Sequence, residues 1–241
     1  MNSGLYAALS GNLAAMRRLD VISNNLANAN TAGFKKDRIA FESLLALRAG
    51  EAPEKAGLVQ ANDIYFTDYS AGPLKQTGNT LDLAIEGDGF FAVNTPQGTA
   101  YTRQGNFERN AAGRLVTKEG YEVLGSGGPI TINGSRVEVS ARGEVMVDGV
   151  QVATLQVVDF PKPYAFQKTG SSQFVPSDPG ATAQPVRTVS VKQGFLEESN
   201  VSVVQEMVQM IEANRYFEAC QRVVKSYDDA AGKAANDIGR I

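Results

Sequence analysis

The amino-acid sequence contains no histidine, no tryptophan and only one cysteine among its 241 residues. The missing histidine excludes Ser-His-Asp and Cys-His triads, an imidazole general base and the HExxH zinc site. The single cysteine excludes an internal disulfide, a CxxC redox pair and a cysteine-rich metal cluster. Composition alone therefore excludes a large part of enzyme chemistry.

The chain also lacks a strong charge of one sign and any long apolar run. Its 23 basic and 26 acidic residues give a formal net charge of −3, without the basic excess typical of nucleic-acid binders. The longest apolar run extends only from Leu5 to Leu9, which is too short to span a membrane. No basic residue precedes it, so it does not match a secretory signal. We expect no nucleic-acid partner, no membrane insertion, and either a cytoplasmic protein or one exported without a cleaved signal.

Turn-forming residues are concentrated in the middle of the chain. Most glycines and all but one of the prolines lie within residues 61–199. The dipeptides Asn133-Gly134 and Asp148-Gly149 each lie between short apolar runs, and each predicts a tight hairpin. Further short apolar segments follow one another at close spacing. We predict an all-β domain, a sandwich or a barrel-like fold, over residues 75–192.

Both ends of the chain predict long helices, because proline is absent before Pro53 and after Pro185. The first helix is expected from about Ser3 to Asn28. The second is expected to begin at a cap on Ser199 or Asn200 and to continue close to Ile238. Each carries an apolar stripe with coiled-coil spacing: Leu5, Leu9, Asn12, Met16, Leu19, Ser23 and Leu26 in the first, and Val203, Met210, Ala213, Phe217, Cys220, Val224 and Tyr227 in the second.

The predicted fold class is α+β, in which the long N- and C-terminal helices pair as a coiled-coil-like rod domain and an all-β domain is inserted between them. The expected parts are residues 1–74 with the first helix, an Asn-rich motif and a linker, residues 75–192, and residues 193–241 with the second helix. The alternative is that the helices cover the β domain as an ordinary α+β fold. Helices about 40 and 60 Å long, apolar on several faces, favour the first arrangement and leave apolar surface for other molecules.

No motif selects a catalytic or cofactor site. Residues 87–92, Gly-Asp-Gly-Phe-Phe-Ala, match the spacing of a dinucleotide-binding loop but lead into a predicted strand instead of a helix. A pair of carboxylates could still hydrolyse glycans without histidine, yet no pattern selects such a pair. Cys220 lies on an apolar stripe and is interpreted as a small hydrophobe. We therefore expect a non-enzymatic protein without a cofactor, a metal or a small-molecule substrate.

The segment from Ser23 to Phe34 is unusually rich in asparagine. Four asparagines within seven residues near the end of an apolar helix have two compatible interpretations. One is a helix terminus with local side-chain caps, closed by Gly33. The other is a set of buried amides that fix the register between closely packed helices.

Four blocks of the sequence resemble the family of flagellar rod, hook and hook-filament-junction axial proteins. They cover over half of the chain and stand in the family's order: NNLANANTAGFK, LDLAIEGDGFF, YTRQGNF with GRLVTKEGYEVLG, and QGFLEESNVSVVQEMVQMIEANRYFEACQRV. The GGPITI stretch, the short length and the modest linker between Phe41 and Tyr65 are most similar to proximal-rod members, with distal-rod or hook-type members as the alternative. The rival from another class is a secreted carboxylate hydrolase acting on glycans.

The resemblance implies a structural subunit of the flagellar basal-body rod. It implies a helical tube built from the terminal helices of many subunits, with the β domain projecting outward, that transmits torque across the periplasm. It also implies export by the flagellar type III apparatus without a cleaved signal peptide, and partners among copies of itself and other proximal and distal rod subunits.

Assembly contacts are expected from both ends of the chain. The N-terminal candidates are Leu5, Leu9, Met16, Leu19, Asn24, Asn25, Leu26, Asn28, Thr31, Gly33 and Phe34. The C-terminal candidates are Val203, Met207, Met210, Ile211, Ala213, Phe217, Cys220, Val224 and Tyr227.

Overall fold

The computed structural model describes residues 2–42, 62–170, 172–178, 180–186 and 190–238. The chain divides into two compact units. The helical unit contains residues 1–28, 36–68 and 201–241, and the β unit contains residues 29–35 and 69–200. The α+β class is thereby confirmed, with a helix at each end and many strands between. The predicted domain boundaries remain predictions, and most of the predicted linker between Phe41 and Tyr65 lies outside the described residues.

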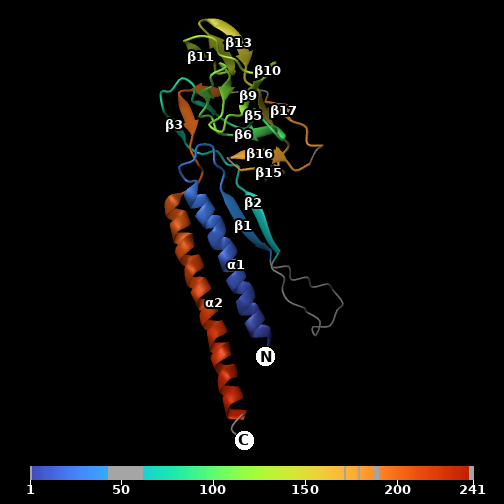
Figure 1. Ribbon diagram of the computed structural model, residues 1–241, viewed down its shortest axis with the longest axis vertical. Helices are drawn as coiled ribbons and strands as arrows, with labels where there is room; N and C mark the ends of the chain where they lie inside the picture. Colours follow the sequence, from blue (N-terminus) through green and yellow to red (C-terminus); the bar gives the residue numbers. More distant parts are fainter. Residues whose placement is uncertain (1, 43–61, 171, 179, 187–189, 239–241) are drawn as a thin grey trace. The chain divides into compact units, whose positions relative to one another are not determined.

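The helical unit is built on α1 (Asn2–Ala27) and α2 (Val203–Ile238), which lie side by side and run in opposite directions (Figure 1). At 1.5 Å per residue, their 26 and 36 residues extend about 39 and 54 Å. The residue before α2 is Ser202, whose carbonyl accepts the Glu206 amide at 3.0 Å. The predicted cap at Ser199 or Asn200 is therefore wrong, because both residues still belong to the β unit.

A strand pair accompanies the helices. β1 (Asp37–Glu42) and β2 (Asn62–Thr67) are antiparallel, with Asp37 opposite Thr67. The Thr67 hydroxyl donates to the Asp37 carboxylate at 2.6 Å, and Arg38 pairs with Asp68 at 2.7 Å. These contacts hold together the start of β1 and the end of β2, which is the end of the strand pair that is connected in sequence to the β unit.

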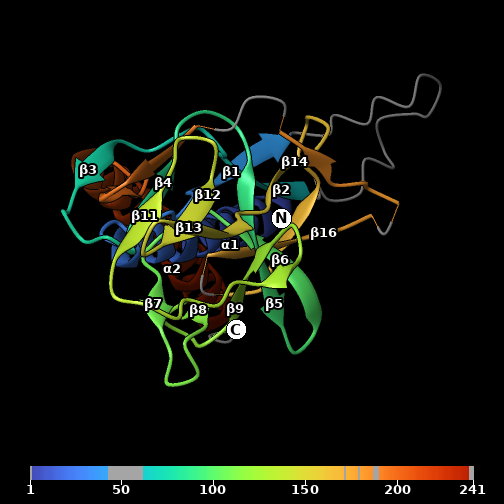
Figure 2. The same ribbon diagram turned by 90° about the horizontal axis from the view of Figure 1, so that it is seen from above.

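The β unit consists of antiparallel strands. In its largest sheet the order is β15-β16-β6-β5-β9-β8-β7, with β10 beside β9, β14 beside β5 and β17 beside β14. Figure 2 shows β7, β8, β9 and β5 in succession. The strands of this sheet are β5 (Phe90–Thr95), β6 (Gly98–Thr102), β7 (Glu108–Arg109), β8 (Leu115–Val116), β9 (Glu122–Gly125), β10 (Gly128–Pro129), β14 (Val157–Asp159), β15 (Phe166–Lys168), β16 (Gln173–Pro176) and β17 (Gln184–Pro185).

Smaller sheets complete the β unit. Three strands form the order β11-β12-β13, and β18 pairs with β4 and β19 with β3. These strands are β3 (Leu74–Gln76), β4 (Leu83–Ile85), β11 (Val137–Val139), β12 (Glu144–Val147), β13 (Val150–Thr154), β18 (Val191–Gln193) and β19 (Phe195–Glu197). The Asp148-Gly149 hairpin joins β12 to β13, as predicted.

The hairpin predicted at Asn133-Gly134 is wrong. Ile130 and Ile132 do not pair with β11: the Ile132 amide donates to the Gly113 carbonyl at 2.6 Å, and β11 pairs with β12. Both isoleucines are almost fully buried in the larger hydrophobic cluster of the β unit. Burial of two isoleucines outweighed the local turn signal.

Strand β5 carries both cores of the β unit. Phe91 and Val93 belong to the larger cluster, whereas Phe90 belongs to a second, aromatic cluster with Phe160 and Phe174. This division follows from the alternation of side chains along a strand. Gly87 and Gly89, both at positive φ, lead into β5, so the dinucleotide-like motif is a turn before a strand, as expected.

Candidate functional site

The contact between α1 and α2 is made by small side chains. Ala8, Ala15 and Ile22, spaced by seven residues, are the buried hydrophobic residues of α1. On α2, Ala213 and Cys220 are buried at the same spacing. A period of seven keeps one face of a helix turned toward its partner. Supercoiling of the pair remains a prediction.

Two glycines allow α2 to approach α1 closely. A Cβ placed on Gly4 would lie 2.2 Å from the Tyr227 hydroxyl oxygen, and one on Gly11 would lie 2.9 Å from the Tyr216 hydroxyl oxygen. Burial, and secondarily the neighbouring Cys220 thiol, raises the pKa of Tyr216. This face was not predicted, because the predicted stripe of α1 follows large apolar residues. The signal was a small-residue heptad at Gly4, Ala8, Gly11 and Ala15.

One end of the helix pair is joined by a buried polar network. Asn25 is 2% exposed, and its amide donates to the Asp37 carbonyl at 2.9 Å and to the Glu206 carboxylate at 3.3 Å. The Asn25 side-chain oxygen accepts the Asp37 amide at 2.9 Å. Asn25 therefore connects α1, β1 and α2. Asn28 instead caps the end of α1 by donating to the Asn24 carbonyl at 2.9 Å, as the local-cap interpretation predicts. Gly33 does not close this cap, because α1 ends at Ala27 and Gly33 binds the Glu197 carbonyl in the β unit. Of the four asparagines, Asn25 alone is buried, so the predicted set of buried amides is reduced to one.

The outer faces of both helices expose large apolar side chains. On α1, Leu9 is 58% and Met16 50% exposed, and on α2 Val204 is 73% and Ile211 54% exposed. Their neighbours on the same helices include Leu5, Tyr6, Leu13, Val203, Met207 and Val208, all exposed. Surfaces of this kind on a soluble protein mark sites of interaction.

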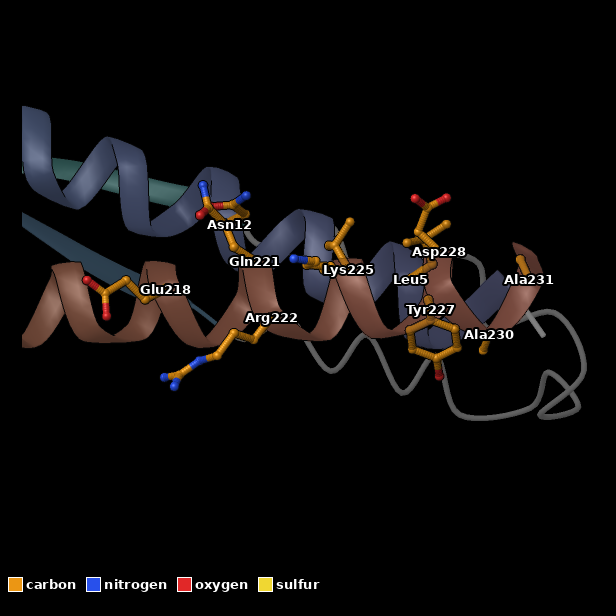
Figure 3. Close-up of a pocket in the computed structure, with 11 residues that line it drawn as sticks. Leu5, Asn12, Glu218, Gln221, Arg222, Lys225, Tyr227, Asp228, Ala230 and Ala231 are labelled. Carbon is orange, nitrogen blue, oxygen red and sulfur yellow. The ribbon is translucent and has the colours of Figure 1, made fainter. Parts of the chain in front are cut away.

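A groove of about 1270 Å³ opens along the helix pair, with Leu5 and Asn12 contributed by α1 and the rest by α2 (Figure 3). Among the described residues, the buried side-chain oxygen of Asn12 is one of the few polar atoms without a hydrogen-bond partner. The α2 side of the groove is lined by apolar, polar and charged residues: Glu218, Gln221, Arg222, Val224, Lys225, Tyr227, Asp228, Ala230 and Ala231.

The N-terminal candidates occupy three environments. Exposed on α1 are Leu5, Leu9, Met16 and Asn24, while Leu19, Leu26, Asn28 and Thr31 are half-buried. Asn25 is buried in the helical unit. Gly33 and Phe34 are buried within the β unit, where Gly33 donates its amide to the Glu197 carbonyl at 2.8 Å.

The C-terminal candidates divide between the paired and the outer face of α2. Ala213 and Cys220 are buried against α1, and Met210, Phe217 and Val224 are half-buried beside them. The exposed candidates of the outer face are Val203, Met207 and Ile211. Tyr227 is also partly exposed, but its hydroxyl lies against Gly4 of α1. Most of the predicted α1 stripe is thus free for other molecules, whereas much of the α2 stripe lies toward α1.

The described residues contain no group of three His, Cys, Asp or Glu side chains that could hold a metal ion. Across the same residues, no helix has the length and hydropathy needed to cross a bilayer.

Three family models match the chain. "Flagella basal body rod protein" matches residues 5–35, "Flagellar hook protein FlgE/F/G D1 domain" matches residues 84–147, and "Flagellar basal body rod FlgEFG protein C-terminal" matches residues 192–237. The first covers most of α1 and the Asn-rich motif, and the last covers α2 and the strand before it.

Relatives match the chain along nearly its whole length. The flagellar basal-body rod protein FlgF of Rhizobium meliloti (strain 1021) is 37% identical over 245 aligned residues, covering 99% of both chains. FlgF of Mesorhizobium japonicum is 35% identical, again with 99% of both covered. FlgG of Bacillus subtilis (strain 168) is 34% identical over 264 aligned residues, covering 98% of this chain and 99% of its own.

Proposed function

Because the chain belongs to the flagellar basal-body rod protein family, we propose that it is a structural rod subunit that polymerises through the outer apolar faces of α1 and α2. The exposed apolar surface of these two helices carries the proposal. A single chain leaves Leu9, Met16 and Ile211 about half exposed, so water contacts apolar area that another subunit could cover.

The polymer is a helical assembly. The faces of α1 and α2 differ in residue content, so contact between copies joins unlike surfaces. Head-to-tail contacts of this kind build rings or open helical filaments. The resulting tube transmits torque through many weak helix contacts acting together.

The position in the rod is that of the FlgF-named relatives, the proximal rod. Two observations support this choice over the FlgG position. The FlgF proteins of Rhizobium meliloti and Mesorhizobium japonicum are 37% and 35% identical, against 34% for FlgG of Bacillus subtilis, and their alignments of 245 residues are shorter than its alignment of 264. FlgG-named relatives therefore carry additional residues that this chain lacks.

The remaining aspects of the proposal are supported by the family relationship. The subunit works in the basal body, where the rod crosses the periplasm, and reaches it through the flagellar type III export apparatus. Its partners are copies of itself and other proximal and distal rod subunits. It catalyses no reaction and requires no cofactor, consistent with a sequence that has no histidine and one cysteine.

Introducing a charge on the outer face tests the proposal. Ile211→Asp places a carboxylate on the exposed face of α2, and we expect loss of rod assembly and of motility, with the isolated chain still folded. Asn214→Asp is the matched control, because it adds the same charge at an exposed polar position of the same helix. Rods counted in isolated basal bodies give the readout. Wild-type rods in the Ile211→Asp strain would contradict assembly through this face.

A further inference from the structure

Three charged side chains lie almost fully buried in the β unit. Lys35 and Glu197 are each 1% exposed, and Arg103 is 5% exposed. None belongs to the hydrophobic clusters, and the family relationship assigns none of them a role. Burial of charge is costly unless the charges are paired and hydrogen-bonded, so such a cluster needs a reason.

Glu197 is the centre of the cluster. Its Oε1 accepts hydrogen bonds from Lys35 Nζ at 2.5 Å and from the Gly72 amide at 2.9 Å, and its Oε2 accepts one from Arg103 Nη1 at 3.1 Å. The Glu197 carbonyl accepts the Gly33 amide at 2.8 Å. One residue therefore binds three segments distant in sequence.

Two of these segments, those of Gly33 with Lys35 and of Gly72, and the segment of Glu197 itself lie close to the points where the chain passes from one unit to the other. The chain changes unit after residues 28, 35, 68 and 200. Lys35 is the last residue of one segment, and its Nζ also donates to the Ser70 carbonyl at 2.7 Å, just after another crossing. Asn200, at the last crossing, donates to the same carbonyl at 3.2 Å. Every crossing segment is thus tied to the cluster or to its direct partners.

Two glycines near the cluster allow the backbones of these segments to lie very close to one another. Gly33 has a φ of +67°, and a Cβ there would lie 2.4 Å from the Arg103 carbonyl carbon. A Cβ on Gly72 would lie 2.0 Å from the Glu198 carbonyl oxygen. The segments can approach this closely only because both positions lack a side chain.

We infer that Lys35, Arg103 and Glu197, here named the junction lock, make the crossing segments open together instead of singly. Directional charged hydrogen bonds fix register in a way that apolar packing does not. A pull on one segment is then shared by all of them. The mechanical meaning of this inference rests on the proposed function, because a torque-bearing rod subunit must pass force through these crossings.

Amide hydrogen exchange of the full chain tests the lock. Glu197→Gln keeps the shape but removes the charge, and Glu198→Gln is the matched control, because Glu198 pairs with Lys75 on the surface. We expect Glu197→Gln to speed exchange of the Gly33 and Gly72 amides at least about tenfold while the Leu83 amide is unchanged. Unchanged Gly33 and Gly72 amides would overturn the inference. An equal acceleration at Leu83 would also overturn it, since it would reveal general destabilisation.

Lys35→Met provides the test if Glu197→Gln does not fold, because it leaves the Arg103–Glu197 pair intact. The same exchange rates at Gly33, Gly72 and Leu83 then decide.

In cells, we expect Glu197→Gln to give normal rod numbers but motility that falls as viscosity rises, unlike Glu198→Gln. Equal motility of both variants at every viscosity, or missing rods in Glu197→Gln, would overturn the mechanical role. A strain without this chain that still builds rods and swims would contradict the proposed function instead.

Discussion

The β unit and the helical unit bury opposite kinds of side chain. The β unit encloses Phe90, Phe91, Phe107 and Phe174, each 2% exposed or less. The buried apolar residues of the two helices are mostly small, and many of their large apolar residues are exposed to water. The β unit thus completes its core within one chain, whereas the helical unit does not. Under the proposed function, we expect assembly to stabilise the helical unit, whereas the β unit needs no neighbour to complete its core.

The largest expected effect comes from one substitution made in both units. Leu115→Ala in the β unit removes a side chain that is 2% exposed, and we expect a loss of about 2–5 kcal/mol in the free energy of unfolding. Leu9→Ala on α1 removes a side chain that is 58% exposed, and we expect a change within about 0.5 kcal/mol in the unassembled chain. Denaturant titration measures both. Similar losses would break the comparison.

A glycine pair tests where the Asn-rich motif belongs. Gly33→Ala combines strain at positive φ with a backbone clash, and we expect a loss of about 2–4 kcal/mol in the stability of the β unit. Gly78→Ala has a similar φ, +76°, but open space around it, so strain alone should cost about 1–2 kcal/mol. Thermal unfolding followed by near-UV circular dichroism distinguishes them. Equal losses of stability in the two variants would mean that the backbone clash at Gly33 adds nothing to the strain at positive φ.

Loss of the buried polar network in the helical unit should have a smaller but measurable effect on the free energy of unfolding. Asn25→Ala leaves the Glu206 carboxylate and the Asp37 amide without their partner, and we expect a loss of about 1–3 kcal/mol in the helical unit. Asn24→Ala, at an exposed position one residue earlier, should change little. Far-UV circular dichroism during urea unfolding reports the helices. An Asn24→Ala variant as unstable as Asn25→Ala would indicate a general helix effect.

The smallest effect concerns a turn of the β unit. The Arg136 amide donates to the Asp148 carboxylate at 3.0 Å and lowers the pKa of that carboxyl below its usual value. A lowered folded pKa contributes stability above the unfolded pKa, and this contribution is lost as pH falls through the folded pKa. NMR titration should give Asp148 a pKa below the usual value of an aspartate carboxyl, and Asp148→Asn should remove its small share of the acid dependence. A pKa of Asp148 at the usual aspartate value would contradict the hydrogen bond from the Arg136 amide.

Local signals predicted the elements better than their partners. The proline-free ends gave α1 and α2, and the Asp148-Gly149 turn gave the hairpin of β12 and β13. The Asn133-Gly134 turn had an equal signal but failed, because its flanking isoleucines are used in the core. Turn chemistry is local, whereas burial depends on residues far away in sequence.

The candidate site was predictable in part for the same reason. The α2 stripe placed Ala213 and Cys220 on the buried face, yet the α1 stripe of large residues lies mostly outside. Small residues carry little hydrophobic signal, so the paired face of α1 was not apparent. The cluster of Lys35, Arg103 and Glu197 was beyond prediction, because no local pattern relates residues so far apart in sequence.

The unequal lengths of the helices give the subunit a direction. Tyr227 lies against Gly4, close to the start of α1, and α2 continues from there to Ile238, about three further turns. One end of the pair is level and the other carries a projecting helix. Copies stacked in series would all point the same way, and the two ends of the growing structure would differ, so that subunits could be added at one end and refused at the other.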